Sequence, residues 1–207
     1  MKYKAILCGA MIACCFWSAS GETAPTLHGD TGLLESPSAD VLASGKGDLG
    51  IWQGDGWRRQ SVAVGLPGGW EMAHGWRFAQ GQATQEESSV KLSLQPETVL
   101  TPGLAIGAES GGSLYGVASK FLPGGYRLHL GVGSGRFDGV FGGIEKVLNP
   151  PHFSKGKTSN SQPTLRAVAD FDGHGLQYGL RAAWQNGWQS QIAYGHDRWY
   201  GGVTLNW

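Results

Sequence analysis

The stretch that decides the fold is Tyr200–Trp207, which reads YGGVTLNW and closes the sequence. Apolar side chains at Val203, Leu205 and Trp207 alternate with small or polar residues. A period of two places successive side chains on opposite faces of a β-strand. The stretch therefore predicts a strand with one apolar and one polar face, which ends on an aromatic side chain.

The same alternation recurs along most of the chain, in runs that are separated by turn residues. Asn186-Gly187 is the strongest hairpin signal, because type I′ turns favour this dipeptide between two alternating runs. Prolines and glycines mark further turns at 67–69, 111–112, 123–125 and 172–175. Few stretches keep a helical period. We expect an all-β chain of about ten to twelve antiparallel strands, the others lying at 48–53, 59–66, 70–78, 90–95, 104–109, 113–120, 127–133, 139–147, 165–171, 176–184 and 188–194.

The beginning of the sequence has the features of a secretory signal peptide. Lys2 and Lys4 precede an apolar run at 5–17, and small residues lead to an expected cleavage near Ser20. The apolar run is shorter than the roughly 20 residues of a membrane-spanning helix. We therefore expect three parts: a signal peptide at 1–20, an N-terminal extension at 21–47 that could form a plug or strap, and a barrel at 48–207.

All three cysteines, Cys8, Cys14 and Cys15, lie within the expected signal peptide. A mature chain without cysteine suits an oxidising compartment of the cell envelope. Met11–Cys14 loosely resembles a lipoprotein box, which leaves lipidation at Cys14 as the alternative to ordinary cleavage.

Charge and composition exclude several classes of function. The chain has 16 Lys and Arg against 16 Asp and Glu, and removal of residues 1–20 takes away Lys2 and Lys4, which leaves 14 against 16, or −2. No basic block predicts a nucleic-acid partner. No later run is long and apolar enough for a spanning helix, so insertion in a membrane would require closed strands.

The two faces of the expected strands differ in chemistry. In a membrane barrel the apolar face would contact lipid, with aromatic side chains near the headgroups; in a soluble barrel or sandwich the faces would be exchanged. The signal peptide, the absence of cysteine and Trp207 favour a single transmembrane barrel. The expected aromatic girdle is Trp76, Phe78, Tyr126, Trp184, Trp188, Tyr194, Trp199 and Trp207. The charges expected to fill the lumen, paired with one another or hydrated, are Glu71, Arg77, Lys91, Glu109, Arg127, Glu145, Arg166, Asp170 and Arg181.

The strand that ends at Trp207 resembles the C-terminal strand of outer-membrane β-barrels, in which a terminal Phe or Trp is an assembly signal. This resemblance implies location in the outer membrane of a Gram-negative envelope, with outer-membrane lipid and the barrel-assembly machinery as partners. The longest connection, 149–163, contains prolines, Ser, Lys and Asn, and we expect it to be a long extracellular loop.

Further blocks of sequence resemble the YjbH family of envelope proteins. The segment Gly29–Ala39 resembles the N-terminal signature of that family, with Gly29, Gly32, Leu33, Pro37 and Ala39 at the matching positions. Ordered likenesses follow at 90–110, 114–120, 130–135, 141–145 and 167–173. The chain departs from the family pattern at Asp40, where a basic residue often follows, and it is shorter than the long members.

The YjbH resemblance implies a non-enzymatic outer-membrane barrel that assists exopolysaccharide or capsule secretion or assembly. Polysaccharide and envelope export proteins would then be its partners. It implies no cofactor, no metal and no catalytic residue.

Two other functions remain open. One is a structural or adhesive barrel without transport. The other is a lipid-acting enzyme, for which His196-Asp197 and Ser190 are the nearest material for a hydroxyl nucleophile and its base. The histidines His28, His74, His129, His152, His174 and His196 are scattered without ligand spacing and give no metal motif.

Overall fold

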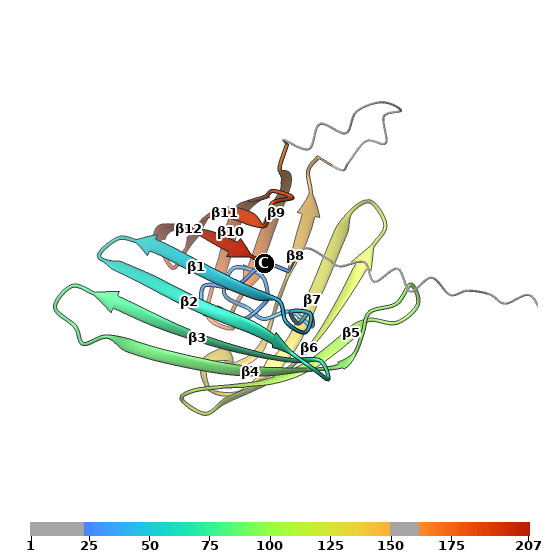
Figure 1. Cartoon of the computed structure of the whole chain (residues 1–207), viewed down its shortest axis with the longest axis horizontal. Helices are drawn as coiled ribbons and strands as arrows, with labels where there is room; N and C mark the ends of the chain where they lie inside the picture. The colour runs from blue at the N-terminus through green and yellow to red at the C-terminus, as the bar shows by residue number, and fades with distance from the viewer. Residues whose placement is uncertain (1–22, 150–161) are drawn as a thin grey trace, which may run out of the picture.

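The computed structural model describes residues 23–149 and 162–207. It is a closed antiparallel β-barrel in which each strand pairs with its neighbours in sequence and β1 pairs with β12 (Figure 1). The strands are β1 (Gly47–Gly54), β2 (Trp57–Leu66), β3 (Trp70–Ala79), β4 (Gln85–Gln95), β5 (Gly103–Glu109), β6 (Ser113–Leu122), β7 (Tyr126–Gly133), β8 (Gly139–Val147), β9 (Thr164–Phe171), β10 (Leu176–Ala183), β11 (Trp188–Gly195) and β12 (Arg198–Asn206), with a single 3-10 turn, η1 (Gly135–Phe137).

Local sequence accounts for the strands and for the turns between them. Every run of alternating residues that the sequence marks as a strand overlaps one of the twelve, which confirms the all-β prediction at the upper end of its range. Gly68 and Gly69 connect β2 to β3 with φ values of 80° and 78°, a region that side chains other than glycine rarely adopt. Among the described residues, no helix is long and apolar enough to cross a membrane.

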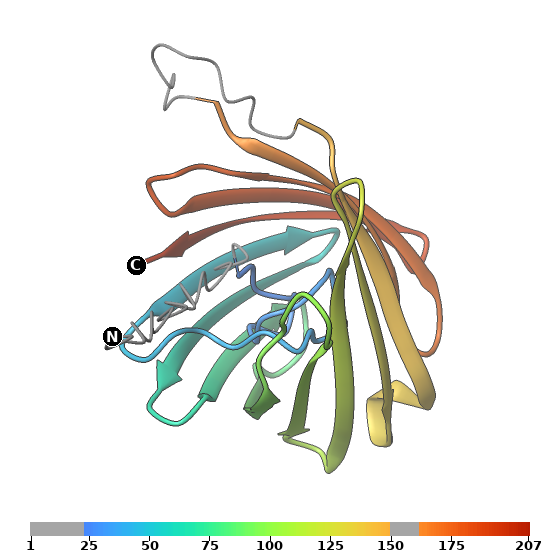
Figure 2. The ribbon, with the colours of Figure 1, turned by 90° about the vertical axis from the view of Figure 1, so that its right-hand side faces the viewer.

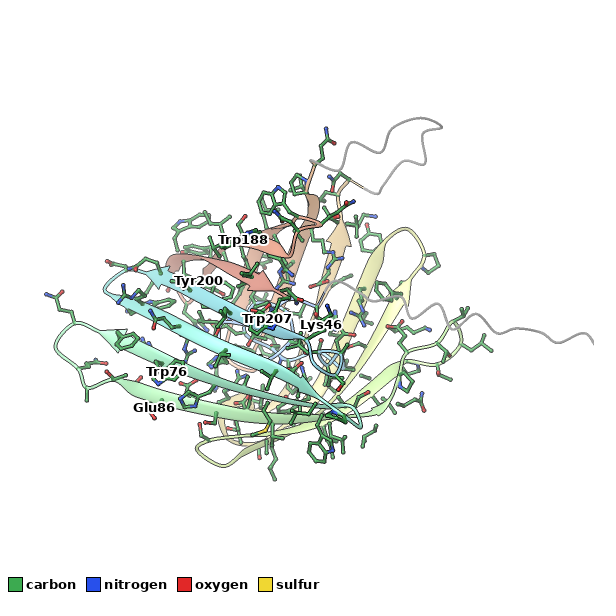
Figure 3. The ribbon with its side chains drawn as sticks, in the orientation of Figure 1. Lys46, Trp76, Glu86, Trp188, Tyr200 and Trp207 are labelled. Atoms are coloured by element: carbon green, nitrogen blue, oxygen red, sulfur yellow. The ribbon has the colours of Figure 1, made fainter. Side chains whose placement is uncertain are left out.

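The barrel has two rims, which we name by the chain ends. The terminal rim is the end at which β1 begins and β12 finishes, where Trp207 N–H donates to the Gly47 carbonyl at 3.1 Å. Figure 3 shows Trp207 beside Lys46 at this rim. The distal rim is the opposite end, with the turns between β1 and β2, β9 and β10, and β11 and β12. The expected extracellular loop, 149–163, lies mostly outside the described residues, and the ends of β8 and β9 that flank it reach the terminal rim.

The outer wall of the barrel is apolar. Aliphatic side chains that are 44–62% exposed cover it on many strands, and a surface of this extent would be costly in water. Of the expected girdle, Trp76 and Trp184 are half-buried, and the others are 37–63% exposed near strand ends: Phe78, Tyr126, Trp188, Tyr194, Trp199 and Trp207. The exposed aliphatic set includes Leu49, Ile51, Met72, Ile106, Leu114, Leu128, Leu130, Val132, Val140, Leu176, Leu180, Ile192 and Val203. This is the orientation of faces expected for a membrane barrel, and not that of a soluble one.

Residues 23–46, which we call the inner loop, lie inside the ring of strands (Figures 1 and 2). Thr23 contacts the start of β11 through Gln189 at the terminal rim, and the chain then runs toward the distal rim and returns to Lys46. The expected signal peptide, 1–20, and its cysteines lie outside the described residues. The expected N-terminal extension therefore corresponds, over its described part, to a segment that occupies the lumen.

Apolar contacts pack the inner loop against the wall at three places. Leu33 and Leu34 are 0% exposed and contact Trp52, Val168 and Tyr200 among others. Burial of a leucine side chain contributes about 1.5–3 kcal/mol. Elsewhere Ala39 joins the aromatic cluster of Tyr115, Phe137 and Phe141, and Leu42 packs on Ala63 and Ala73.

Candidate functional site: an inner loop in the lumen and a polar pocket at the distal rim

The nine charges predicted to fill the lumen all occupy inward-facing positions of their strands. Arg77, Glu109 and Arg166 are partly exposed, and Arg77 lines a pocket near the distal rim. The other six are at most 8% exposed: Glu71, Lys91, Arg127, Glu145, Asp170 and Arg181.

Only some of these charges pair with one another. Glu71 and Lys91 approach to 3.2 Å, and Glu145 and Arg181 to 3.0 Å, each pair joining different strands. Other partners come from outside this set: Arg136 of η1 for Glu109 at 2.8 Å, and the inner loop for Arg127 and Asp170. Because buried polar groups must find hydrogen bonds, the lumen charges and the backbone of the inner loop satisfy each other.

Asp170 of β9 holds the middle of the inner loop. Its Oδ2 accepts hydrogen bonds from the backbone N–H groups of Leu34, Glu35 and Ser36, at 3.2, 2.7 and 3.0 Å. Three successive N–H groups that converge on one oxygen form a concave anion-binding backbone. Asp170 is 0% exposed, so water does not compete for these donors.

Glu71 and Lys91 hold the inner loop on the opposite wall. Glu71 accepts from the backbone N–H groups of Thr31 at 2.8 Å and Leu42 at 2.7 Å, which lie on the outgoing and returning arms. Lys91 Nζ donates to the Thr31 carbonyl at 2.6 Å. Both members of the ion pair therefore also bind the inner loop. Removal of either one would leave the other as a buried charge without its partner.

Two arginines bind other parts of the same loop. Arg181 donates to the Leu33 carbonyl at 2.7 Å. Arg127 binds Asp40 through both terminal nitrogens and Glu97 at 3.0 Å. The carboxylate of Asp40, at the position where the expected YjbH resemblance would have a basic residue, is the partner of Arg127.

The family-like residues of the inner loop lie at its most confined points. Gly32 has no room for a side chain, because a Cβ would lie 2.3 Å from the Ser36 carbonyl oxygen and 2.6 Å from Thr26 Cγ2. Gly29 has a φ of 104°. Gly32 pairs with Pro37 in an isolated β-bridge, Leu33 is fully buried, and the Ala39 N–H donates to Ser119 at 2.8 Å.

A polar pocket of about 330 Å³ opens between the tip of the inner loop and the distal rim. Its basic side chains are Arg59, Arg77 and Arg198, and its acidic ones are Glu35 and Glu87. Leu27, His28, Trp57, Gly195, His196 and Tyr200 complete the lining.

Contacts within the pocket fix part of this set. Arg59 forms an ion pair with Glu87 at 2.5 Å, and His28 Nδ1 lies 2.8 Å from the same carboxylate. Arg77 donates to Gln85 at 3.2 Å. Within 23–149 and 162–207, no described ion pair or side-chain hydrogen bond includes Arg198, which leaves its guanidinium available to a ligand.

Glu35, at the tip of the inner loop, is held as a carboxylate. Burial would raise its pKa, but the hydrogen-bonding and charge contributions of His28 outweigh this, with a smaller one from His196, and the pKa falls below its usual value. The site therefore has a negative charge beside two imidazoles.

The residues considered for a lipid-acting enzyme do not come together. Ser190 is near the start of β11 and His196 follows its end, six residues away, which corresponds to about 20 Å along a strand. His196 Nε2 instead lies 2.8 Å from Asp172. The pocket residues His28, Glu35 and His196 were not predicted as a set, because they come from the inner loop and a turn, distant in sequence.

No protein-family model and no curated protein matches the chain. Among solved structures, the chain is similar to two described as "KdgM porin" and "KdgM porin in complex with disordered oligogalacturonate". For each the identity is 12%, the TM-score is 0.50, and the match covers 78% of this chain and 98% of the other. At this identity the likeness shows the fold alone, a closed antiparallel β-barrel.

Proposed function

We propose that this chain is a non-enzymatic outer-membrane β-barrel that assists the secretion or assembly of a surface polysaccharide. The observation that carries the membrane assignment is the orientation of the faces, with aliphatic side chains outside and charged ones inside. The role in polysaccharide handling is supported by the resemblance of Gly29–Ala39 and later blocks to YjbH proteins. The porin-type fold, seen in a neighbour complexed with oligogalacturonate, is compatible with it.

The orientation follows from the even number of strands. A chain that reaches the outer membrane from the periplasm keeps both of its ends on the periplasmic side of such a barrel. The terminal rim, where both ends lie, is therefore periplasmic. The distal pocket then faces the cell exterior. The ends of β8 and β9 that flank 149–163 lie at the terminal rim, so this assignment argues against the extracellular loop expected there.

The distal pocket fits an acidic saccharide better than a neutral one. Three arginines face two glutamates, and Arg198 is available. Trp57 and Tyr200 supply aromatic surface, with ring centroids 6.2 Å apart. A charge-assisted hydrogen bond contributes about 1.5–3 kcal/mol, so loss of one arginine contact should weaken binding about tenfold or more.

Tryptophan fluorescence of the purified barrel tests the saccharide assignment, with Trp57→Phe to identify the part of the emission that comes from Trp57. We expect an acidic oligosaccharide, and not its neutral counterpart of equal length, to change the emission, with about tenfold weaker binding in Arg198→Gln. Arg58→Gln is the matched control, because Arg58 is an exposed arginine of the same rim that contacts Phe78 on the outer wall. Equal binding of both saccharides would overturn the assignment.

The second candidate, a structural barrel without transport, is favoured by one observation. Glu71, Lys91 and Asp170 on the inner wall are at most 1% exposed, so the inner loop covers these charges rather than leaving them to line an open channel. Single-channel recording separates the two functions: a transport role requires conductance once the inner loop is released, whereas a structural barrel stays silent in every variant.

A further inference from the structure

We propose that Glu35, Asp172 and His196 form a binding site for a divalent metal ion of the zinc class, which joins the inner loop to the distal rim. One ligand atom from each residue lies within 4.8 Å of the others. His196 Nε2 is 2.8 Å from Asp172 Oδ2 and 4.0 Å from Glu35 Oε2. One imidazole with two carboxylates is a donor set that zinc accepts.

The distances are close to those of a metal centre. Two ligands bound to zinc at about 2.0–2.1 Å in tetrahedral geometry are separated by about 3.3 Å. The contact of His196 with Asp172 would lengthen by about 0.5 Å, as a metal ion takes the place of the shared proton, and Glu35 would approach by a similar amount. His196 lies in the two-residue turn between β11 and β12, and its side chain is 45% exposed, so this adjustment is open to it.

Neighbouring groups already orient the carboxylate of Asp172. Its Oδ1 accepts from the backbone N–H groups of His174 and Gly175, at 2.9 Å each, which directs Oδ2 toward His196. Gln177 Nε2 donates to Oδ2 at 3.3 Å, and Oε1 of the same side chain accepts from the Tyr200 hydroxyl at 2.7 Å. Such supporting contacts fix the ligands of metal sites and raise metal affinity.

The carboxylate of Glu35 also has a neighbouring group, the imidazole of His28. His28 Nε2 lies 3.9 Å from Glu35 Oε2, while His28 Nδ1 is occupied by Glu87 at 2.8 Å. The imidazole of His28 therefore turns Nε2 toward Glu35 and supports this carboxylate from outside the set of three ligands. Contacts of this kind orient the carboxylates that bind metal ions.

The site leaves one coordination position of the metal ion open, and its ligands come from two parts of the chain. Three protein ligands leave a coordination position for water or a ligand, and Glu35 and His196 both line the distal pocket. Glu35 belongs to the inner loop, whereas Asp172 and His196 belong to the barrel. A bound ion would therefore hold the loop in place and also offset the negative charges of Glu35 and Asp172.

Calorimetric titration of the metal-stripped, detergent-solubilised barrel with Zn²⁺ tests the inference. We expect one equivalent to bind, with binding weakened at least tenfold in Glu35→Gln and in His196→Asn. His74→Asn is the matched control, because His74 contacts Ser88 on the outer wall, away from the site, and it should bind as wild type. Gel mobility before and after heating checks that each barrel is folded.

The visible absorption of Co²⁺ gives a second, structural readout. Co²⁺ in the site should show the strong bands of a four-coordinate ion, and Glu35→Gln should abolish them. The inference is overturned if wild type binds no stoichiometric Zn²⁺, if both site variants bind as wild type, or if His74→Asn removes the binding.

Discussion

Replacement of Asp170 by alanine should release the inner loop while the strands stay paired. Three backbone N–H groups of the loop donate to one oxygen of Asp170, at 2.7–3.2 Å. A hydrogen bond to a charged acceptor contributes about 1.5–3 kcal/mol, and a buried donor without a partner costs about 1–3 kcal/mol. Allowing for non-additivity among neighbouring bonds, we expect a loss of about 4 kcal/mol in docking free energy. This corresponds to about a thousandfold larger population of released loop.

Asp170→Asn separates the charge from the geometry. The amide oxygen can still accept the three N–H groups, although bonds to a neutral acceptor contribute only about 0.5–1.5 kcal/mol each. The second carboxylate oxygen, Oδ1, has no hydrogen-bond partner among the described residues, so an amide nitrogen displaces no existing bond there. We expect the population of released loop in Asp170→Asn to be about one to two orders of magnitude lower than in Asp170→Ala, and higher than in wild type.

A single cysteine reports the release. Residues 23–207 contain no cysteine, and Ser36 is 0% exposed, so Ser36→Cys should react with a maleimide only when the loop leaves the lumen. The labelling rate, measured in barrels that keep their folded gel mobility, should rise about a thousandfold with Asp170→Ala. Equal labelling rates in folded wild type and Asp170→Ala would refute the reasoning.

The other predictions concern pH, packing and assembly. Burial raises the pKa of Asp40, but the charge and hydrogen bonds of Arg127 outweigh this and lower it below the ordinary 3.8. The stabilisation of the docked loop by Asp40 should therefore persist as pH falls to 3.8 and be lost only below. The acid-dependent rise in the reaction of Ser36→Cys with a dipyridyl disulfide, which reacts with thiols in acid, should be smaller in Asp40→Asn. Gly32→Ala should weaken loop docking by about 1–3 kcal/mol through overpacking, seen as faster labelling, whereas Gly116→Ala, with no atom closer than 4.0 Å, should leave the rate unchanged. Trp207→Ala should lower the amount of barrel recovered in the outer membrane, because Trp207 packs on Gly47 at the closing strand pair; unchanged recovery would contradict an assembly role.

The strands could be predicted from sequence because their signal is local. Alternation with period two and turn dipeptides such as Asn186-Gly187 depend only on neighbouring residues, and all twelve strands carry one of these signals. Closure of the sheet between β1 and β12 is not local, and it was expected only by physical argument and resemblance.

The contents of the lumen could not be predicted in the same way. The bonds from Leu34, Glu35 and Ser36 to Asp170 span more than a hundred residues of sequence, and no spacing rule indicates them. Sequence identified the charges on the inner face, but a charge whose partner is a backbone N–H leaves no complementary residue to find. Asp40 is an example, because no feature of the sequence indicates that its carboxylate pairs with Arg127, 87 residues further along the chain.

The path of the inner loop has a mechanical consequence. Thr23 and Lys46 both lie at the terminal rim, so the segment enters and leaves by the same opening. The inner loop can therefore leave the lumen without the passage of a free chain end through the barrel. A force applied to the chain before Thr23 would break the contacts of the inner loop in succession. The returning arm is continuous with β1 and would guide the loop back into the lumen.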